Sequence, residues 1–215
     1  MECLVIVICD NPAPDFLILD KLLLSAHYAD IEYAVVVNKS DLGSDCLNYI
    51  EREYPFLENL FFVSAESGDG INSLKDFLYG KSVAFAGQSA VGKTSLINRL
   101  TGSSYLTGKL SNKSGRGRHT TTYSKLLRAE SFSVFDTPGF SELYADIQPF
   151  DVPLNFQPYE KIAERCKFCD CTHIDEPDCA VKYAVENGML SSDRYERYKA
   201  IYKEVMTEYK KRYGK

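Results

Sequence analysis

A phosphate-binding sequence lies near the middle of the chain. Residues 87–94 read GQSAVGKT and match the pattern GxxxxGK[ST], directly after an apolar run at Ser82–Ala86. Between a strand and a helix, such a loop surrounds phosphate oxygens with backbone N–H groups, its lysine binds the β- and γ-phosphates, and its hydroxyl binds Mg²⁺. We therefore expect a nucleotide at Gly87, Gln88, Ser89, Ala90, Val91, Gly92, Lys93, Thr94 and Ser95, with Lys93 also assisting catalysis.

A second motif, Asp136-Thr-Pro-Gly139, follows an expected strand at Phe132–Phe135. The Asp136 carboxylate can hold the shell of a Mg²⁺ ion, and the Gly139 N–H can contact a γ-phosphate. A DxxG tetrapeptide alone is also compatible with an ordinary turn. Together with the phosphate loop upstream, it predicts a site that distinguishes a nucleoside triphosphate from its diphosphate.

A third motif, Asn38-Lys39-Ser40-Asp41, follows an expected strand at Tyr33–Val37. The Asp41 carboxylate can accept hydrogen bonds from N1–H and the 2-amino group of guanine, a pattern that adenine does not offer. We expect Asn38 to tie this loop to the phosphate loop and the Lys39 stem to cover the base. A polar turn is the simpler explanation of the four residues taken alone.

Ser64 and Ala65 end the next expected strand, where a backbone N–H can meet guanine O6. With every motif at a strand end, the pattern predicts GTP and GDP as ligands. An ATP-using kinase or ATPase with a phosphate loop is the less favoured alternative, because Asp41 selects against adenine.

Five metal-ligating side chains lie close together near the C-terminus: Cys166, Cys169, Cys171, His173 and Cys179. In a cytosolic chain such a cluster indicates a metal site rather than a set of disulfide bonds. A tetrahedral zinc needs four of the five, and spacing alone favours Cys166 and Cys169 with His173 and Cys179. A closed site of four protein ligands is structural. The remaining cysteines, Cys3, Cys9 and Cys46, are expected to be small buried residues.

Expected strands alternate with expected helices along the first 150 residues, and these elements must position the site residues. We expect strands at Leu4–Cys9, Tyr33–Val37, Leu60–Val63, Ser82–Ala86, Thr120–Ala129 and Phe132–Phe135, the last two as a hairpin. Intervening helices, such as Ile71–Leu78, predict a mostly parallel α/β sheet with helices on both faces. We expect helices alone beyond a proline-containing connection at Phe150–Pro158. The predicted domains are residues 1–150, which bind the nucleotide, and residues 151–215, which are helical and bind zinc.

Composition and charge limit the possible functions. The chain has 215 residues and a net charge of −5, yet Phe77–Ala129 contains no acid and nine cations, which favours a polyanionic partner. No apolar run approaches the roughly 18–20 residues of a membrane helix, and no signal peptide is evident. We expect a cytoplasmic protein with no membrane contact, and a monomer.

The order of the motifs is unusual. The motif Asn38–Asp41 (NKxD) and the pair Ser64-Ala65 (SA) precede the phosphate loop and DxxG in the chain. This order is that of a circularly permuted GTPase, which the surface position of domain termini permits. The permuted order, the segments GQSAVGKTSLIN, GRGRHTTT (residues 115–122), DTPGF and CKFCDCTHIDEPDCAV together resemble the RsgA/YjeQ family. The resemblance extends from Leu4 to about Tyr209.

The resemblance implies a GTPase that acts late in maturation of the small ribosomal subunit, binds its rRNA, and hydrolyses GTP faster when bound to that subunit. The family pattern C-x₄-C-x-H-x₅-C implies one structural zinc on Cys166, Cys171, His173 and Cys179, with Cys169 a bystander. Members usually carry an N-terminal OB-fold, which we expect to be absent here because three residues precede the first strand. The alternative function is a non-enzymatic RNA-binding module with GTP as a structural ligand.

The residue after DxxG is Phe140, where Ras-type GTPases have a glutamine that orients the attacking water. Intrinsic hydrolysis is therefore expected to be slow. His119 is the best substitute within the expected switch segment, and an RNA contact is its alternative role. Thr122 is expected to bind Mg²⁺ through its hydroxyl, in preference to Thr120 and Thr121.

Overall fold

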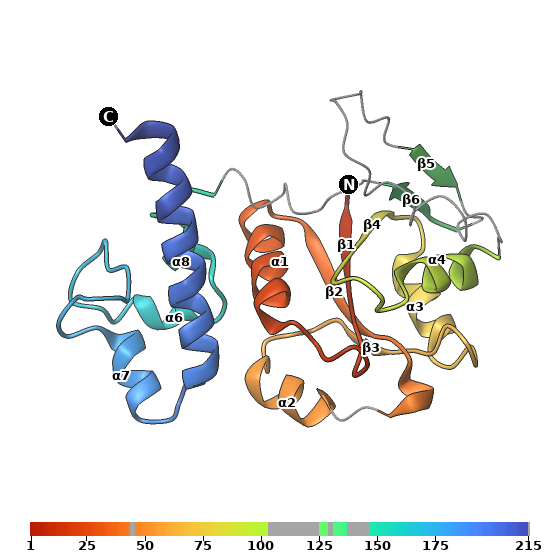
Figure 1. The fold of residues 1–215 in the computed structure, drawn as a ribbon, viewed down its shortest axis with the longest axis horizontal. Coiled ribbons are helices and arrows are strands. Elements are labelled where there is room, and N and C mark those ends of the chain that lie inside the picture. The colour runs from red at the N-terminus through yellow and green to blue at the C-terminus, as the bar shows by residue number, and fades with distance from the viewer. Residues whose placement is uncertain (44–45, 103–124, 129–130, 137–146, 215) are drawn as a thin grey trace. The chain divides into compact units, whose positions relative to one another are not determined.

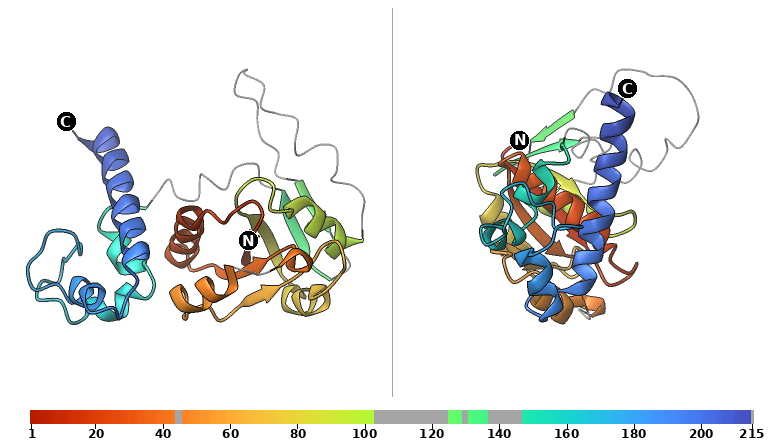
Figure 2. Two further views of the ribbon diagram at one scale, coloured as in Figure 1. Left: turned by 60° about the horizontal axis from the view of Figure 1, so that its bottom comes forward. Right: turned by 90° about the vertical axis from the view of Figure 1, so that its left-hand side faces the viewer.

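A computed structural model describes residues 1–43, 46–102, 125–128, 131–136 and 147–214 (Figures 1 and 2). The chain forms two compact units. The sheet unit comprises Met1–Asp15, Ile31–Leu47 and Leu57–Phe140. The helical unit comprises Phe16–Asp30, Asn48–Phe56 and Ser141–Lys215.

The sheet unit contains one six-stranded sheet with the order β3-β2-β1-β4-β6-β5 (Figure 1). All neighbouring pairs are parallel except β5 and β6, which are antiparallel, as expected for a hairpin. The strand bounds are β1 Cys3–Ile8, β2 Glu32–Val37, β3 Leu60–Phe62, β4 Ser82–Ala86, β5 Lys125–Arg128 and β6 Ser133–Asp136. The predicted mostly parallel sheet is therefore confirmed.

Strand β1 lies at the centre because every one of its residues is apolar and buried. Two helices of the same unit, α3 (Ile71–Leu78) and α4 (Lys93–Thr101), place apolar side chains into a core with alternate strand residues. Val5 and Val7 belong to that core, together with Leu74 and Leu96. The buried side chains of α3 are Ile71, Leu74 and Leu78, three and four residues apart. This helical spacing explains why the short sequence forms a helix against the sheet.

The helical unit consists of short helices and one long helix, α8, which runs almost to the C-terminus (Figure 2). Its core joins Phe156, Tyr159 and Tyr198 with Ile201 and Val205. No strand occurs among its described residues, as expected. The helices that contribute to it are α1 Phe16–Tyr28, α2 Cys46–Glu53, α5 Asp151–Asn155, α6 Tyr159–Ala163, α7 Ala180–Glu186 and α8 Ser192–Tyr213.

One secondary-structure prediction was wrong. The segment expected to be a connection, Phe150–Pro158, contains helix α5. Its proline, Pro153, lies in the first turn, where a missing N–H breaks no helical hydrogen bond. A short 3₁₀ helix, η1 at Ser40–Leu42, was also not anticipated.

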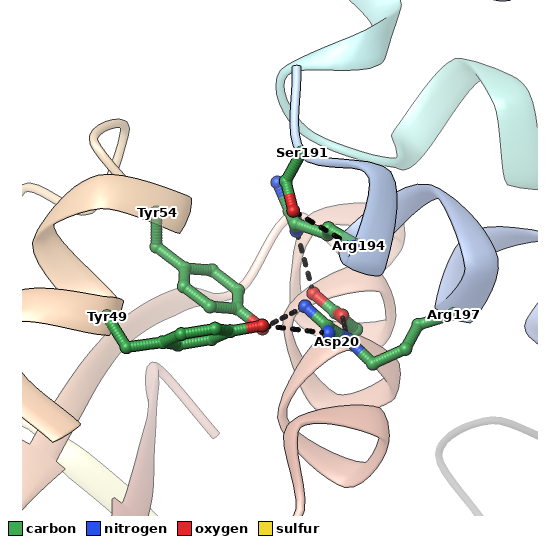
Figure 3. A network of polar contacts seen from close by, with 6 residues as sticks. All are labelled: Asp20, Tyr49, Tyr54, Ser191, Arg194 and Arg197. Atoms are coloured by element: carbon green, nitrogen blue, oxygen red, sulfur yellow. Dashed lines mark hydrogen bonds and ion pairs between the residues drawn. The ribbon is translucent and has the colours of Figure 1, made fainter. Parts of the chain in front are cut away.

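A buried ionic network crosses the helical unit (Figure 3). Asp20 of α1 is fully buried and accepts from Arg194 at 2.9 Å and from Arg197 at 2.6 Å. Arg197 also donates to the hydroxyl groups of Tyr49 and Tyr54, each at 3.1 Å. Two guanidinium groups thus contact a single carboxylate, so α1 and α8 are joined by ion pairs, and the Tyr49 hydroxyl adds α2 through a hydrogen bond.

The two units do not follow the chain in simple succession. Residues Phe16–Asp30 and Asn48–Phe56 belong with the C-terminal residues, although they lie within the first 150. The predicted boundary after residue 150 stays a prediction about folding domains. Within the described residues, no helix is long and apolar enough to cross a membrane.

Candidate nucleotide and metal sites

The nucleotide motifs gather at one edge of the sheet because each follows a parallel strand. Gly87 follows β4, Asn38 follows β2, and Ser64 lies just after β3. Asp136 is the last residue of β6, which pairs with β4. From β1 the sheet extends to one side through β2 and β3, and the chain then continues on the other side of β1 with β4 and β6. The position between β1 and β4 is therefore a topological switch point, where α/β sheets bind ligands.

Two glycines shape the phosphate loop. Gly87 has φ +133°, and a Cβ there would lie 2.1 Å from the carbonyl oxygen of Val7. Gly92 has φ +89° and is the N-cap residue directly before α4. Both conformations are ones that side chains disfavour, so only glycine lets the loop pass this close to β1 and turn into the helix.

Lys93 reaches back across the phosphate loop. Its Nζ donates to the carbonyl oxygens of Gly87 at 2.8 Å and Gln88 at 2.6 Å. Burial lowers the pKa of Lys93. The ammonium therefore lies against the carbonyl oxygens at the start of the phosphate loop. Thr94 and Ser95 occupy the following turn of α4, whereas Ser89 and Ala90 are exposed at the loop tip.

Asn38 links its own motif, Asn38–Asp41 (the guanine motif), to the phosphate loop and to the turn at Ser64 and Ala65. Its side chain is 2% exposed, and its Nδ2 donates to the carbonyl oxygen of Val91 at 2.9 Å. Its Oδ1 accepts from the N–H of Ala65 at 3.2 Å. The structure thus brings Asn38 to the phosphate loop, as predicted, and also ties it to the backbone of Ala65.

Lys39 and Asp41 differ in their surroundings. The Nζ of Lys39 donates to the carbonyl oxygens of Asn11 at 2.7 Å and Ala90 at 3.0 Å. Asp41 lies in η1 and is exposed, so its carboxylate is accessible to a base. The N–H of Ser40 donates to Val63, which sets the loop against the end of β3.

Ser64 is fully buried and acts within its own loop. Its Oγ accepts from the N–H of Ser67 at 3.0 Å. The side chain of Ser64 therefore shapes the turn after β3, and the hydrogen bond of Ala65 to Asn38 joins that turn to the guanine motif.

Sequence reasoning missed the segment after β1. The carbonyl oxygens of Asn11 and Ala13 accept hydrogen bonds from Lys39 and Gln88, and the N–H of Asp15 donates to Gln88. The segment contributes only backbone atoms to these hydrogen bonds, so the residue types within it did not predict them.

Several predicted site residues lie outside the described residues. They are His119 and Thr122 of the expected switch segment and Gly139 of DxxG. For Asp136 the structure describes the backbone, as the end of β6.

Four metal-ligating atoms converge in the helical unit. One atom each from Cys166, Cys171, His173 and Cys179 lies within 4.8 Å of every other. The Sγ of Cys179 is 3.9 Å from that of Cys166 and 3.4 Å from Nδ1 of His173. Usual Zn–S and Zn–N lengths in a tetrahedron put ligand atoms about 3.5–3.8 Å apart, so this set fits zinc. Cys169 is exposed and outside the group.

Helix α8 and one glutamate support the loop that carries His173. The hydroxyl of Tyr195 donates to the His173 carbonyl at 2.6 Å, and that of Tyr198 donates to the Thr172 carbonyl at 2.5 Å. Glu176 accepts from the N–H and hydroxyl of Thr172 and from the N–H of Ile174. The loop is therefore held on both sides, with His173 at φ +62°.

Burial and hydrogen bonds shift the pKa values of His173 and Glu176. Burial lowers the pKa of His173 to about 4, so its imidazole is neutral near pH 7, the form that binds metals. Burial alone would raise the pKa of Glu176, but the hydrogen bonds from Thr172 and Ile174 lower it to about 2. Glu176 is therefore a carboxylate at any physiological pH.

Comparison with known proteins identifies the family. A family model described as RsgA GTPase matches residues 1–146. The small ribosomal subunit biogenesis GTPase RsgA of Thermotoga neapolitana is 38% identical over 95% of this chain and 71% of its own length. The protein of the same name from Bacillus cereus is 38% identical over 93% of this chain and 71% of its own length.

Two solved structures share the fold. The crystal structure of YjeQ from Thermotoga maritima covers 96% of this chain and 72% of its own, with 34% identity and a TM-score of 0.74. The structure of YloQ, titled a circularly permuted GTPase, covers 96% of this chain and 69% of its own, with 26% identity and a TM-score of 0.76. The fold is therefore the predicted permuted one, and the chain belongs to the RsgA GTPase family.

Proposed function

We propose that this GTPase acts late in maturation of the small ribosomal subunit, binds its rRNA, and turns over faster on that subunit. One observation supports guanine-nucleotide binding above the rest, namely that Asn38 bonds to the phosphate loop and to Ala65 at once. The names of the relatives supply the ribosomal role. The acid-free segment Phe77–Ala129 supplies cations suited to rRNA phosphates.

In this proposal the base, the phosphates and the metal have separate partners. Asp41 accepts from the guanine edge, and Lys39 covers the base. Backbone N–H groups of the phosphate loop and the Lys93 ammonium hold the phosphates. Mg²⁺ would be held by Thr94 and Thr122, with Asp136 in its shell, and would neutralise charge on the β- and γ-phosphates.

Hydrolysis needs a water in line with the γ-phosphate. Gly139 would donate its N–H to that phosphate, and His119 would accept a hydrogen bond from the water. Phe140 cannot orient a water, so turnover of the isolated chain is expected to be slow. We propose that the small subunit completes the site, which makes hydrolysis dependent on the partner.

Zinc has a structural role in the proposal. Cys166, Cys171, His173 and Cys179 leave no open coordination position, so the ion would fold the loop and take no part in hydrolysis. We also propose that the protein is a cytoplasmic monomer.

Phosphate release under multiple turnover, with and without purified small subunits, tests the function. We expect slow release by the chain alone and at least about tenfold faster release with the subunit. The control is Lys93→Ala, which removes a phosphate contact and should release no phosphate in either case. GTP binding without turnover, even on the subunit, would instead indicate an RNA-binding module with GTP as a structural ligand.

A further inference from the structure

The side chain of Gln88 bonds to a segment that lies outside the phosphate loop. Its Nε2 donates to the carbonyl oxygen of Ala13 at 2.8 Å, and its Oε1 accepts from the N–H of Asp15 at 2.5 Å. One amide thus engages both a donor and an acceptor of the segment after β1. Those bonds use both polar atoms of the glutamine side chain.

The same segment is held by the guanine motif. The Nζ of Lys39 donates to the carbonyl oxygen of Asn11 and also to that of Ala90 in the phosphate loop. Segment Asn11–Asp15 is therefore bonded by one side chain from each of two nucleotide motifs. No pattern of residue types in the segment itself predicts this position.

The segment leads directly into the helical unit. Asp15 is the last residue of the first stretch of the sheet unit, and Phe16 begins both the helical unit and α1. Helix α1 carries Asp20, whose buried carboxylate binds Arg194 and Arg197 of α8 (Figure 3). Asp15 is therefore the residue that directly precedes α1 in the chain.

Nucleotide binding must change the surroundings of Gln88. In the structure the Lys93 ammonium donates to the carbonyl oxygens of Gly87 and Gln88. A phosphate is a charged and stronger acceptor, so it draws the ammonium away from these carbonyls. Phosphate oxygens also fix the N–H groups of the loop. On these grounds the backbone that carries the Gln88 side chain is expected to exchange the Lys93 ammonium for other partners when a nucleotide binds.

We propose that Gln88 is a positioning residue that transmits nucleotide binding to Asp15 and to the first turn of α1. Bound nucleotide fixes the backbone of Gln88, which strengthens its hydrogen bond to the Asp15 N–H. The inference rests on the guanine-nucleotide binding proposed above. It is independent of the ribosomal partner.

Hydrogen exchange of single amides in the full chain, with and without saturating GDP and Mg²⁺, tests the proposal. In the wild type, GDP should slow exchange at the Asp15 amide by roughly tenfold. Gln88→Met keeps the length of the side chain but has neither donor nor acceptor, so GDP should no longer slow exchange at Asp15. Gln88→Glu keeps an acceptor for the Asp15 N–H and should retain the slowing.

Calorimetric titration with GDP measures nucleotide binding in every variant. If the wild type does not bind GDP, the proposed nucleotide binding is itself wrong. If the wild type binds GDP and exchange at Asp15 does not slow, the role of Gln88 is wrong. Slowing at Asp15 that survives in Gln88→Met also overturns it. Should Gln88→Met not fold, loss of the slowing in Gln88→Glu overturns it instead.

Discussion

A Cβ on Gly92 would lie 2.4 Å from Nδ2 of Asn38. The phosphate loop and the guanine motif therefore meet at a point where only a hydrogen atom fits. Gly92 also has φ +89°, a conformation that alanine disfavours. The close approach lets Asn38 donate to the carbonyl oxygen of Val91, next to Gly92.

Gly92→Ala should weaken GDP binding by at least about tenfold, because it displaces Asn38 and costs roughly the net value of its hydrogen bonds. Titration with GDP measures the affinity. Gly80→Ala is the matched control, since Gly80 has φ +76° but no atom within 4 Å of its Cβ position. It should strain the backbone and keep the affinity. Equal affinities for GDP in the two variants would contradict the role of Gly92.

Asp41→Asn should weaken GTP binding and strengthen binding of xanthosine triphosphate. Xanthine carries an oxygen where guanine has its amino group, so an amide donor suits xanthine better than a carboxylate does. Sites built on hydrogen bonds discriminate such analogues by up to ~10⁴–10⁵. Competition between the two triphosphates measures the preference. A variant that still prefers GTP would remove Asp41 from the base site.

Cys171→Ala should lose zinc, whereas Cys169→Ala should retain one zinc per chain. The reason is geometric, because Cys171 belongs to the convergent group and Cys169 is exposed outside it. Metal analysis after dialysis against a weak chelator gives the content of each variant. The opposite pattern would show that Cys169, and not Cys171, is the ligand.

Asp20→Ala should lower the free energy of unfolding by about 3–5 kcal/mol, because it leaves Arg194 and Arg197 without their carboxylate. Glu204→Ala is the matched control. It removes the partner of Lys21 from an exposed ion pair, which is worth about 0–1 kcal/mol. Urea unfolding of the full chain measures both. A loss below about 1 kcal/mol for Asp20→Ala would mean that the buried network does not stabilise the unit.

His119→Ala should leave GTP affinity within a few-fold and lower subunit-stimulated turnover by at least ~10²-fold. The base and phosphate contacts remain, and only the group that orients water is lost. His119 lies outside the described residues, so this expectation rests on the sequence. Binding of the subunit with a non-hydrolysable GTP analogue is the control. Loss of that binding in parallel with turnover would make His119 an RNA contact.

The sequence by itself determined the nucleotide site to a large extent. Phosphate loop, DxxG, NKxD and SA each follow a run of apolar residues, and parallel strands end at the same edge of a sheet. That rule is enough to bring Gly87, Asn38 and Ser64 together. Strand β4 and helix α3 have the predicted bounds, because apolar periodicity is a local property of the chain.

The sequence left two readings of the metal site, because spacing alone favours Cys169 and the family pattern implies Cys171. The structure groups Cys171 with the other three candidate ligands. Only the tertiary structure decided two further features. It placed α1 with the C-terminal helices through Asp20 and Arg194, a pair 174 positions apart. It also engaged Gln88 with the backbone of Ala13 and Asp15. These contacts join distant residues outside any recognised motif, or use backbone atoms that every residue carries, so the residue types in the sequence did not predict them.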